Sequence, residues 1–147
     1  MFVVVGATGN TGSAVVETLL SKKQPIRVIV RSADKGVAWK AKGADVAVAS
    51  LDDVSALAQA FAGATGVYLM VPPNYGATAW LSDQQARMDR AAEAVKKSGV
   101  SHIVYLSSVG GQLPNGTGPI RAVHYGEGKL AGAVTHLTIL RPPSFME

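Results

Sequence analysis

The sequence predicts an α/β fold of the doubly wound kind, in which helices flank a parallel sheet of about six strands. Three observations support this prediction. Short apolar runs rich in β-branched residues recur along the chain, segments with helical spacing lie between them, and a glycine-rich loop follows the first run directly. Alternation of strand and helix favours right-handed crossovers and parallel strands. No linker divides the chain, so we expect residues 1–147 to form one domain.

Six apolar runs are predicted to be the strands. Near-continuous Val, Ile and Leu are typical of strands that are covered on both faces, as in a parallel sheet with helices above and below. The predicted strands are Phe2–Val5, Ile26–Val30, Asp45–Ala49, Val67–Val71, His102–Leu106 and Leu137–Leu140.

Helices are predicted between these runs, and Gly or Pro separates the elements. The segments with helical spacing are Thr11–Lys22, Asp34–Lys42, Val54–Phe61 and Trp80–Ser98. In the longest of them, one apolar stripe is expected to face the sheet, formed by Leu81, Gln85, Met88, Ala92 and Val95. The irregular segment Gly110–Gly118 is predicted to be a flexible loop near a site.

The loop after the first strand reads Gly6-Ala7-Thr8-Gly9-Asn10-Thr11-Gly12 and opens a helix. Glycine at these spacings permits a tight turn, a close approach of the backbone to a pyrophosphate, and tight packing of helix on strand. The N–H groups and the positive end of the helix would hold the anion. Thr8, Asn10 and Thr11 can add polar contacts. This pattern is typical of Rossmann-type dinucleotide binding; a glycine-rich turn without a ligand is the alternative.

The end of the second strand favours NADP(H) over NAD(H). An acidic residue at this place binds the ribose 2′-hydroxyl, whereas arginine accommodates a 2′-phosphate. Arg31 follows Val30 at this point, and Ser32 and Lys35 lie within plausible reach of the same phosphate. A solvated surface charge is the alternative interpretation of Arg31.

These motifs together resemble the NmrA-like family of atypical short-chain dehydrogenases/reductases. The resemblance spans nearly the whole chain and rests on Val5–Gly12, Val28–Arg31, Ala60–Val67, Val104–Ser108 and Leu140–Glu147. It implies a Rossmann domain that binds NADP(H) or NAD(H), followed by a smaller C-terminal substrate region. Members include quinone and azo-dye reductases, isoflavone-reductase-like enzymes, and redox-sensing regulators that bind cofactor without turnover.

The sequence departs from the family pattern in two places. Ala49-Ser50 replaces the usual Gly-Asp pair, whose carboxylate approaches the adenine; Ser50 could still accept a hydrogen bond from the adenine amino group. The family also continues beyond the segment Ser144–Glu147, where this sequence stops with two apolar residues, Phe145 and Met146. We therefore expect the substrate region to be absent or truncated, or the C-terminal end to be covered by something else.

Tyr125 and Lys129 form a Tyr-x-x-x-Lys pattern, which places both side chains on one face of a helix. In the wider short-chain dehydrogenase family the lysine activates the tyrosine and holds the nicotinamide ribose, while the tyrosine exchanges a proton with substrate. Ser107, or its neighbour Ser108, would assist from the end of the fifth strand. The alternatives are a surface pair, or a Lys129 that binds cofactor without chemistry. His124 could relay a proton or be a loop residue.

The loop after the fourth strand begins Met70-Val71-Pro72-Pro73 and lies on the same sheet edge as the glycine loop. Its prolines lack backbone donors and stiffen the chain. Val71 and Pro72 are therefore expected to form a wall beside the nicotinamide ribose, although the prolines could simply end the strand. No His, Asp and Glu cluster has metal-ligand spacing, and we expect no metal site.

Composition narrows the functional classes. Lys and Arg exceed Asp and Glu by 14 to 10, but the basic residues are scattered without aromatic interleaving, which argues against nucleic acid. The sequence lacks cysteine, and its N-terminus resembles neither a signal peptide nor a membrane span. A cytoplasmic protein without a membrane partner is therefore expected.

The leading hypothesis is an NADP(H)-dependent oxidoreductase that transfers hydride to a small electrophile such as a quinone. A redox sensor that binds NADP(H) and presents a surface to a regulatory protein partner is the alternative from another class. A cofactor-binding remnant without activity is a third. The sequence is also compatible with a homo-oligomer.

Overall fold

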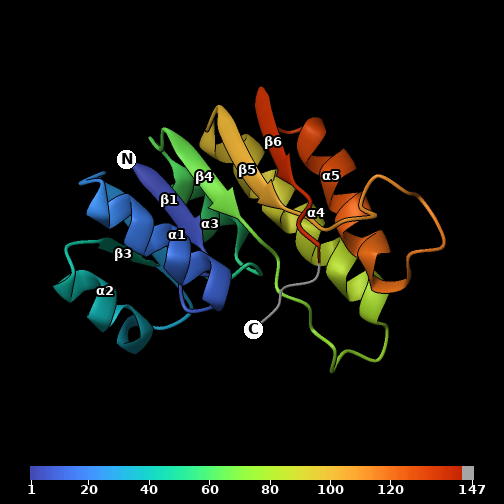
Figure 1. Ribbon diagram of the computed structural model, residues 1–147, viewed down its shortest axis with the longest axis horizontal. Helices are drawn as coiled ribbons and strands as arrows, with labels where there is room; N and C mark the ends of the chain where they lie inside the picture. The colour runs from blue at the N-terminus through green and yellow to red at the C-terminus, as the bar shows by residue number, and fades with distance from the viewer. Residues whose placement is uncertain (144–147) are drawn as a thin grey trace.

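Six parallel strands form one sheet in the computed structural model, which describes residues 1–143 (Figure 1). Their order is β3-β2-β1-β4-β5-β6, and each neighbouring pair is parallel. The predicted doubly wound, Rossmann-type fold is confirmed. The strands are β1 (Phe2–Val5), β2 (Ile26–Val30), β3 (Asp45–Val48), β4 (Gly66–Leu69), β5 (His102–Leu106) and β6 (His136–Leu140). The prediction about Phe145 and Met146 lies outside the described residues.

Helices cover both faces of the sheet (Figure 1). They are α1 (Asn10–Ser21), α2 (Val37–Ala41), α3 (Val54–Phe61), α4 (Trp80–Ser98) and α5 (Arg121–Ala131), with 3-10 turns at Ala33–Gly36 and Gly118–Ile120. The helices α3, α4 and α5 pack side by side on one face, and α1 and α2 lie on the other. No helix within residues 1–143 is long and apolar enough to cross a membrane.

The continuous apolar character of β1 follows from its central place. Val3 and Val5 pack into the core beneath α3 and α4, whereas Val4 packs into the core beneath α1. All three side chains are buried. Successive side chains of a strand point to opposite faces, so a strand with helices on both sides needs apolar residues at every position.

Several predicted boundaries move by one or two residues. The strand predicted at Val67–Val71 ends at Leu69, since the following prolines cannot donate to a sheet and bias the residue before them out of regular structure. The helix predicted at 34–42 divides into a 3-10 turn and the short α2.

Of the predicted stripe of α4, Met88, Ala92 and Val95 are buried, whereas Leu81 and Gln85 are only partly buried. Gln84, not Gln85, is buried, because its amide Nε2 donates to the Pro72 carbonyl oxygen (3.4 Å). A buried polar side chain with a backbone partner cannot be found from apolar spacing alone.

The direction of strand addition reverses between β1 and β4. The chain leaves β1 toward α1 on one face and leaves β4 toward α4 on the other. Such opposite departures open a crevice at the carboxyl ends of the two strands, which is where open α/β sheets bind ligands.

Candidate dinucleotide-binding site

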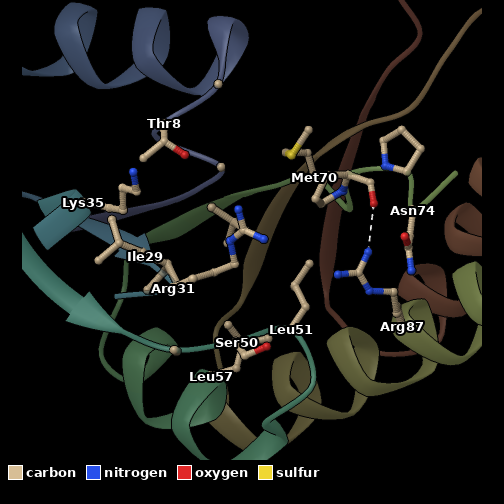
Figure 2. Close-up of a pocket in the computed structure, with 17 residues that line it drawn as sticks. Thr8, Ile29, Arg31, Lys35, Ser50, Leu51, Leu57, Met70, Asn74 and Arg87 are labelled. Carbon is tan, nitrogen blue, oxygen red and sulfur yellow. Dashed lines mark hydrogen bonds between the residues drawn. The ribbon is translucent and has the colours of Figure 1, made fainter. Parts of the chain in front are cut away.

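A cleft of about 770 Å³ lies at this crevice (Figure 2). Four loops and two helices contribute to its walls: the glycine loop after β1, the loops after β2, β3 and β4, and the helices α3 and α4. Its lining residues include Gly6, Thr8, Gly9, Ile29, Arg31, Lys35, Ser50, Leu51, Met70, Pro72, Pro73, Asn74 and Arg87. The volume falls within the range of small-molecule and cofactor sites.

The glycine loop has the geometry that its spacing predicts. Gly6 has a φ of +80°, and its carbonyl oxygen accepts a hydrogen bond from the Gly9 N–H at 3.0 Å, which closes the turn. A Cβ at Gly12 would overlap the Gly6 carbonyl group, so only glycine allows α1 to pack this closely on the loop. A Cβ at Gly6 would lie 2.7 Å from the Met70 sulfur. The loop is therefore a cradle that larger residues would fill.

The first turn of α1 points its positive end into this cradle. It begins at Asn10, directly after Gly9, and contains no acidic residue. An anion at the cleft would therefore meet the helix dipole without competition from a carboxylate in that turn.

The cleft is basic. Arg31, Lys35 and Arg87 are among its lining residues, and no Asp or Glu is found among the described residues that line it. Within residues 1–143, no carboxylate lies within ion-pair distance of any of these three cations. Their positive charge is left for a ligand, which suits the phosphates of a dinucleotide.

Most of the predicted cofactor residues meet at the cleft. Gly6, Thr8, Gly9, Arg31, Lys35, Ser50 and Pro72 line it. Asn10, Thr11 and Gly12 lie beside it in the first turn of α1. Val71 is not among the lining residues; Met70 and Pro72, on either side of it, are.

Ser50 lies on the wall after β3, but its hydroxyl already serves the local turn. It accepts a hydrogen bond from the Asp52 N–H (3.1 Å) and donates to the Asp52 carboxylate (3.4 Å). Asp52 in turn pairs with Arg90 of α4 at 2.6 Å. These contacts hold the loop after β3 against α4.

Tyr125 and Lys129 share one face of α5, as their spacing predicts, but neither is among the residues that line the cleft. Both contact Asp89 of α4: the Tyr125 hydroxyl donates to Oδ1 at 2.9 Å, and the Lys129 ammonium lies 2.8 Å from the same oxygen. The hydrogen bond to Asp89 raises the pKa of Lys129. Although burial opposes it, the contacts with Lys129 and Tyr125 hold the pKa of Asp89 below its ordinary value.

Ser107 is buried at the end of β5, and its hydroxyl donates to Glu127 of α5 at 2.5 Å. Arg141, just after β6, donates to both carboxylate oxygens of Glu127, at 2.9 and 2.7 Å. Burial raises the pKa of Glu127, but the hydrogen bonds from Arg141 and Ser107 outweigh it, so the pKa is lowered and the carboxylate is charged. The one hydroxyl proton of Ser107 is therefore directed to Glu127.

Sequence reasoning missed Arg87, Glu127 and Arg141. Arg87 lies in the predicted helix 80–98, one turn after the buried Gln84, but only the folded loop after β4 shows that its side chain meets a cleft. His124 contacts the Gly111 carbonyl oxygen through Nδ1 (2.8 Å) and so braces the loop after β5. Within residues 1–143, no group of three or more His, Asp or Glu could hold a metal ion.

Known proteins resemble this chain in both sequence and fold. The family described as NAD(P)H-binding matches residues 6–147. An NAD(P)H azoreductase from Xenophilus azovorans is 33% identical over 111 residues, 75% of this chain and 36% of that protein. An NmrA-like family domain-containing oxidoreductase from Aspergillus japonicus is 34% identical over 110 residues, 71% of this chain and 33% of that protein.

A solved structure agrees. An NADPH-dependent quinone oxidoreductase from Escherichia coli, determined with NADPH, superposes with a TM-score of 0.80 at 28% identity and covers 96% of this chain and 48% of that one. The chain thus spans about a third of the length of the curated relatives and about half of this structure. The chain therefore belongs to the NAD(P)H-binding family, among the NmrA-like, atypical short-chain dehydrogenases/reductases.

Proposed function

We propose that this chain is the NADP(H)-binding part of a cytoplasmic oxidoreductase that reduces a small electrophile such as a quinone. The observation that carries the proposal is the cleft itself, which combines the glycine cradle with Arg31 and Lys35 and has no carboxylate among its described lining residues.

Each part of the cofactor has a matching group in the cleft. Gly6, Gly9 and the first turn of α1 would hold the pyrophosphate, since backbone N–H groups and a helix N-terminus bind anions. Arg31 and Lys35 would hold the 2′-phosphate, which NAD(H) lacks. Pro72 would form a wall beside the nicotinamide ribose. The bound nicotinamide would supply the hydride, while these residues orient it and exclude water.

Two relatives support a reductive reaction. The similar proteins include an NAD(P)H azoreductase and an NADPH-dependent quinone oxidoreductase, and azo groups and quinones are both conjugated electrophiles. A small conjugated acceptor is the substrate class that we propose here.

A redox sensor is the second candidate, and the contacts of the proton donors favour it. The hydroxyls of Tyr125 and Ser107 donate to Asp89 and Glu127, and the Lys129 ammonium pairs with Asp89. A catalytic role for this trio would need at least one of these contacts to open. A protein that binds cofactor and signals to a partner needs no proton donor.

Calorimetric titration with NADPH, NADH and their oxidised forms tests the binding proposal, and the absence of binding by every form would overturn it. NADPH oxidation over a panel of quinones and azo dyes then separates the two candidates. Turnover on any acceptor supports the reductase. Tight binding without turnover on the whole panel argues against the reductase and leaves the sensor or a cofactor-binding remnant.

A further inference from the structure

We propose that Arg87 of α4 binds the adenine ring of the dinucleotide and recognises it without contacting the amino group. This inference rests on the proposed NADP(H) binding. It assigns the base to a residue on a helix instead of to the loop after β3, where Ser50 stands.

Arg87 lies on the wall of the cleft across from Arg31. Figure 2 shows its guanidinium extending into the cleft from the side opposite Arg31, with Leu51 of the loop after β3 on the floor between them. One turn further along α4, Arg90 is fixed to Asp52 of the same loop at 2.6 Å. The ion pair keeps this part of α4 beside Ser50 and Leu51, the wall where the base is expected.

Most N–H donors of the Arg87 guanidinium are not used by contacts within residues 1–143. Its Nη1 donates to the Pro72 carbonyl oxygen at 3.0 Å, and no carboxylate within residues 1–143 pairs with it. An arginine carries five N–H donors, so most of them remain for a ligand. The contact with Pro72 fixes the orientation of the group in advance, which lowers the entropic cost of binding.

Ser50 offers the base much less. Its hydroxyl proton is directed at Asp52, and its oxygen already accepts from the Asp52 N–H. Adenine presents ring nitrogens as acceptors and an aromatic face, and a guanidinium suits both through N–H donors and through cation–π stacking. The cleft therefore offers the base a hydrogen-bond donor, the Arg87 guanidinium. The carboxylate of the usual Gly-Asp pair would instead accept a hydrogen bond from the amino group.

Base selectivity follows from this difference. Hypoxanthine keeps the acceptors N3 and N7 and the aromatic face, whereas its N1 carries a hydrogen and it has a carbonyl oxygen where adenine has its amino group. We expect the unchanged protein to bind deamino-NADPH within about threefold of NADPH, since no hydrogen bond to the amino group is lost. A loss of tenfold or more would overturn the inference, and this measurement needs no variant.

The second measurement compares Arg87→Leu with the unchanged protein by calorimetry. Arg87→Leu is expected to weaken NADPH, NADH and adenosine 2′,5′-bisphosphate by one common factor of about tenfold or more, and to leave reduced nicotinamide mononucleotide unchanged. Unchanged affinities would overturn the inference. So would a loss confined to NADPH and the bisphosphate, which would assign Arg87 to the 2′-phosphate.

Controls separate binding from folding. Arg121→Leu removes an exposed arginine outside the cleft and should change no affinity. The Pro72 carbonyl oxygen keeps the Gln84 amide as a partner in Arg87→Leu. If thermal melting nevertheless shows that this variant is unfolded, Arg87→Met, which keeps the length of the side chain but has no donor, carries the same comparison. An unchanged protein that binds neither NADPH nor NADH refutes the proposed function, whereas binding that is insensitive to Arg87 refutes only the role of Arg87.

Discussion

Arg31 stands at the end of β2 without a carboxylate partner within residues 1–143, so its charge is available to a phosphate. Arg31→Ala is expected to weaken NADPH by about 10- to 100-fold, the worth of a charged hydrogen bond, and NADH much less. Calorimetry with both cofactors measures the difference. Equal losses would remove the 2′-phosphate role, and Lys35→Ala should show the same preference more weakly.

The glycine cradle is tested by a matched pair of substitutions to alanine. At Gly12 a Cβ overlaps the Gly6 carbonyl group, whereas at Gly128, in α5, it meets nothing within 4 Å. Gly12→Ala should lower both cofactor affinity and melting temperature. Gly128→Ala should raise the free energy of unfolding by about 0.5–1 kcal/mol, because alanine favours a helix, and leave binding unchanged. Equal effects of the two variants would contradict the close packing of α1 on the loop.

At the scale of elements, α5 is tied to its neighbours by two carboxylates, one on each side. Glu127 joins it to the ends of β5 and β6, and Asp89 of α4 holds its outer face. A Cβ at Gly111 would lie 2.5 Å from the Glu127 carboxylate, so the loop after β5 closes over this contact as well. The position of the whole β5–α5–β6 unit depends on these polar contacts.

Glu127 is expected to make the free energy of unfolding depend on pH in the acid range. Its pKa is lowered in the folded protein from an ordinary value of 4.5, so its contribution is fully present above that value and is lost as the pH falls through the lowered one. Glu127→Gln is expected to cost about 1–3 kcal/mol at neutral pH. Urea unfolding of both proteins from pH 7 to below pH 4 should show the difference shrinking in the acid range. A difference that does not change with pH would show that the charge is unimportant.

The packing of α5 against α4 also bears on the role of the Tyr125 and Lys129 pair. Because Asp89 holds both groups, we expect Tyr125→Phe to leave NADPH oxidation within about twofold of the unchanged rate. General acid catalysis contributes about 10²- to 10⁴-fold, so a loss of that size would establish Tyr125 as the proton donor. Asp89→Asn then tests whether Asp89 holds back a catalytic Tyr125. If it does, the substitution should free the Tyr125 hydroxyl and raise the rate of NADPH oxidation; if the pair is only structural, the rate should not rise.

Across the whole molecule, the sequence was most informative about features within one element or its adjoining turn. The apolar runs and the glycine loop predicted the sheet and its phosphate cradle, because strand burial and turn geometry depend on neighbouring residues. Contacts between distant segments were not predictable: the Tyr125 hydroxyl meets a carboxylate 36 positions away, and Arg87 reaches a loop 15 positions before it. Helix packing brings these residues together, and the spacing of residues along the sequence does not predict how the helices pack.

Ligand binding is expected to stabilise the whole fold, because the cleft joins loops from β1, β2, β3 and β4. A ligand at 100 times its dissociation constant adds about 2.7 kcal/mol to the free energy of unfolding. The melting temperature should therefore rise when NADPH is added, and should rise less with an equal concentration of NADH. Equal shifts with the two cofactors would contradict the proposed preference.

The central position of β1 has a consequence for motion. It pairs with β2 on one side and β4 on the other and is covered on both faces, so its amide protons should exchange with solvent only when the whole domain unfolds. The phosphate turn grows directly from the end of this strand. A bound pyrophosphate would therefore rest on a turn that stays rigid while the domain remains folded.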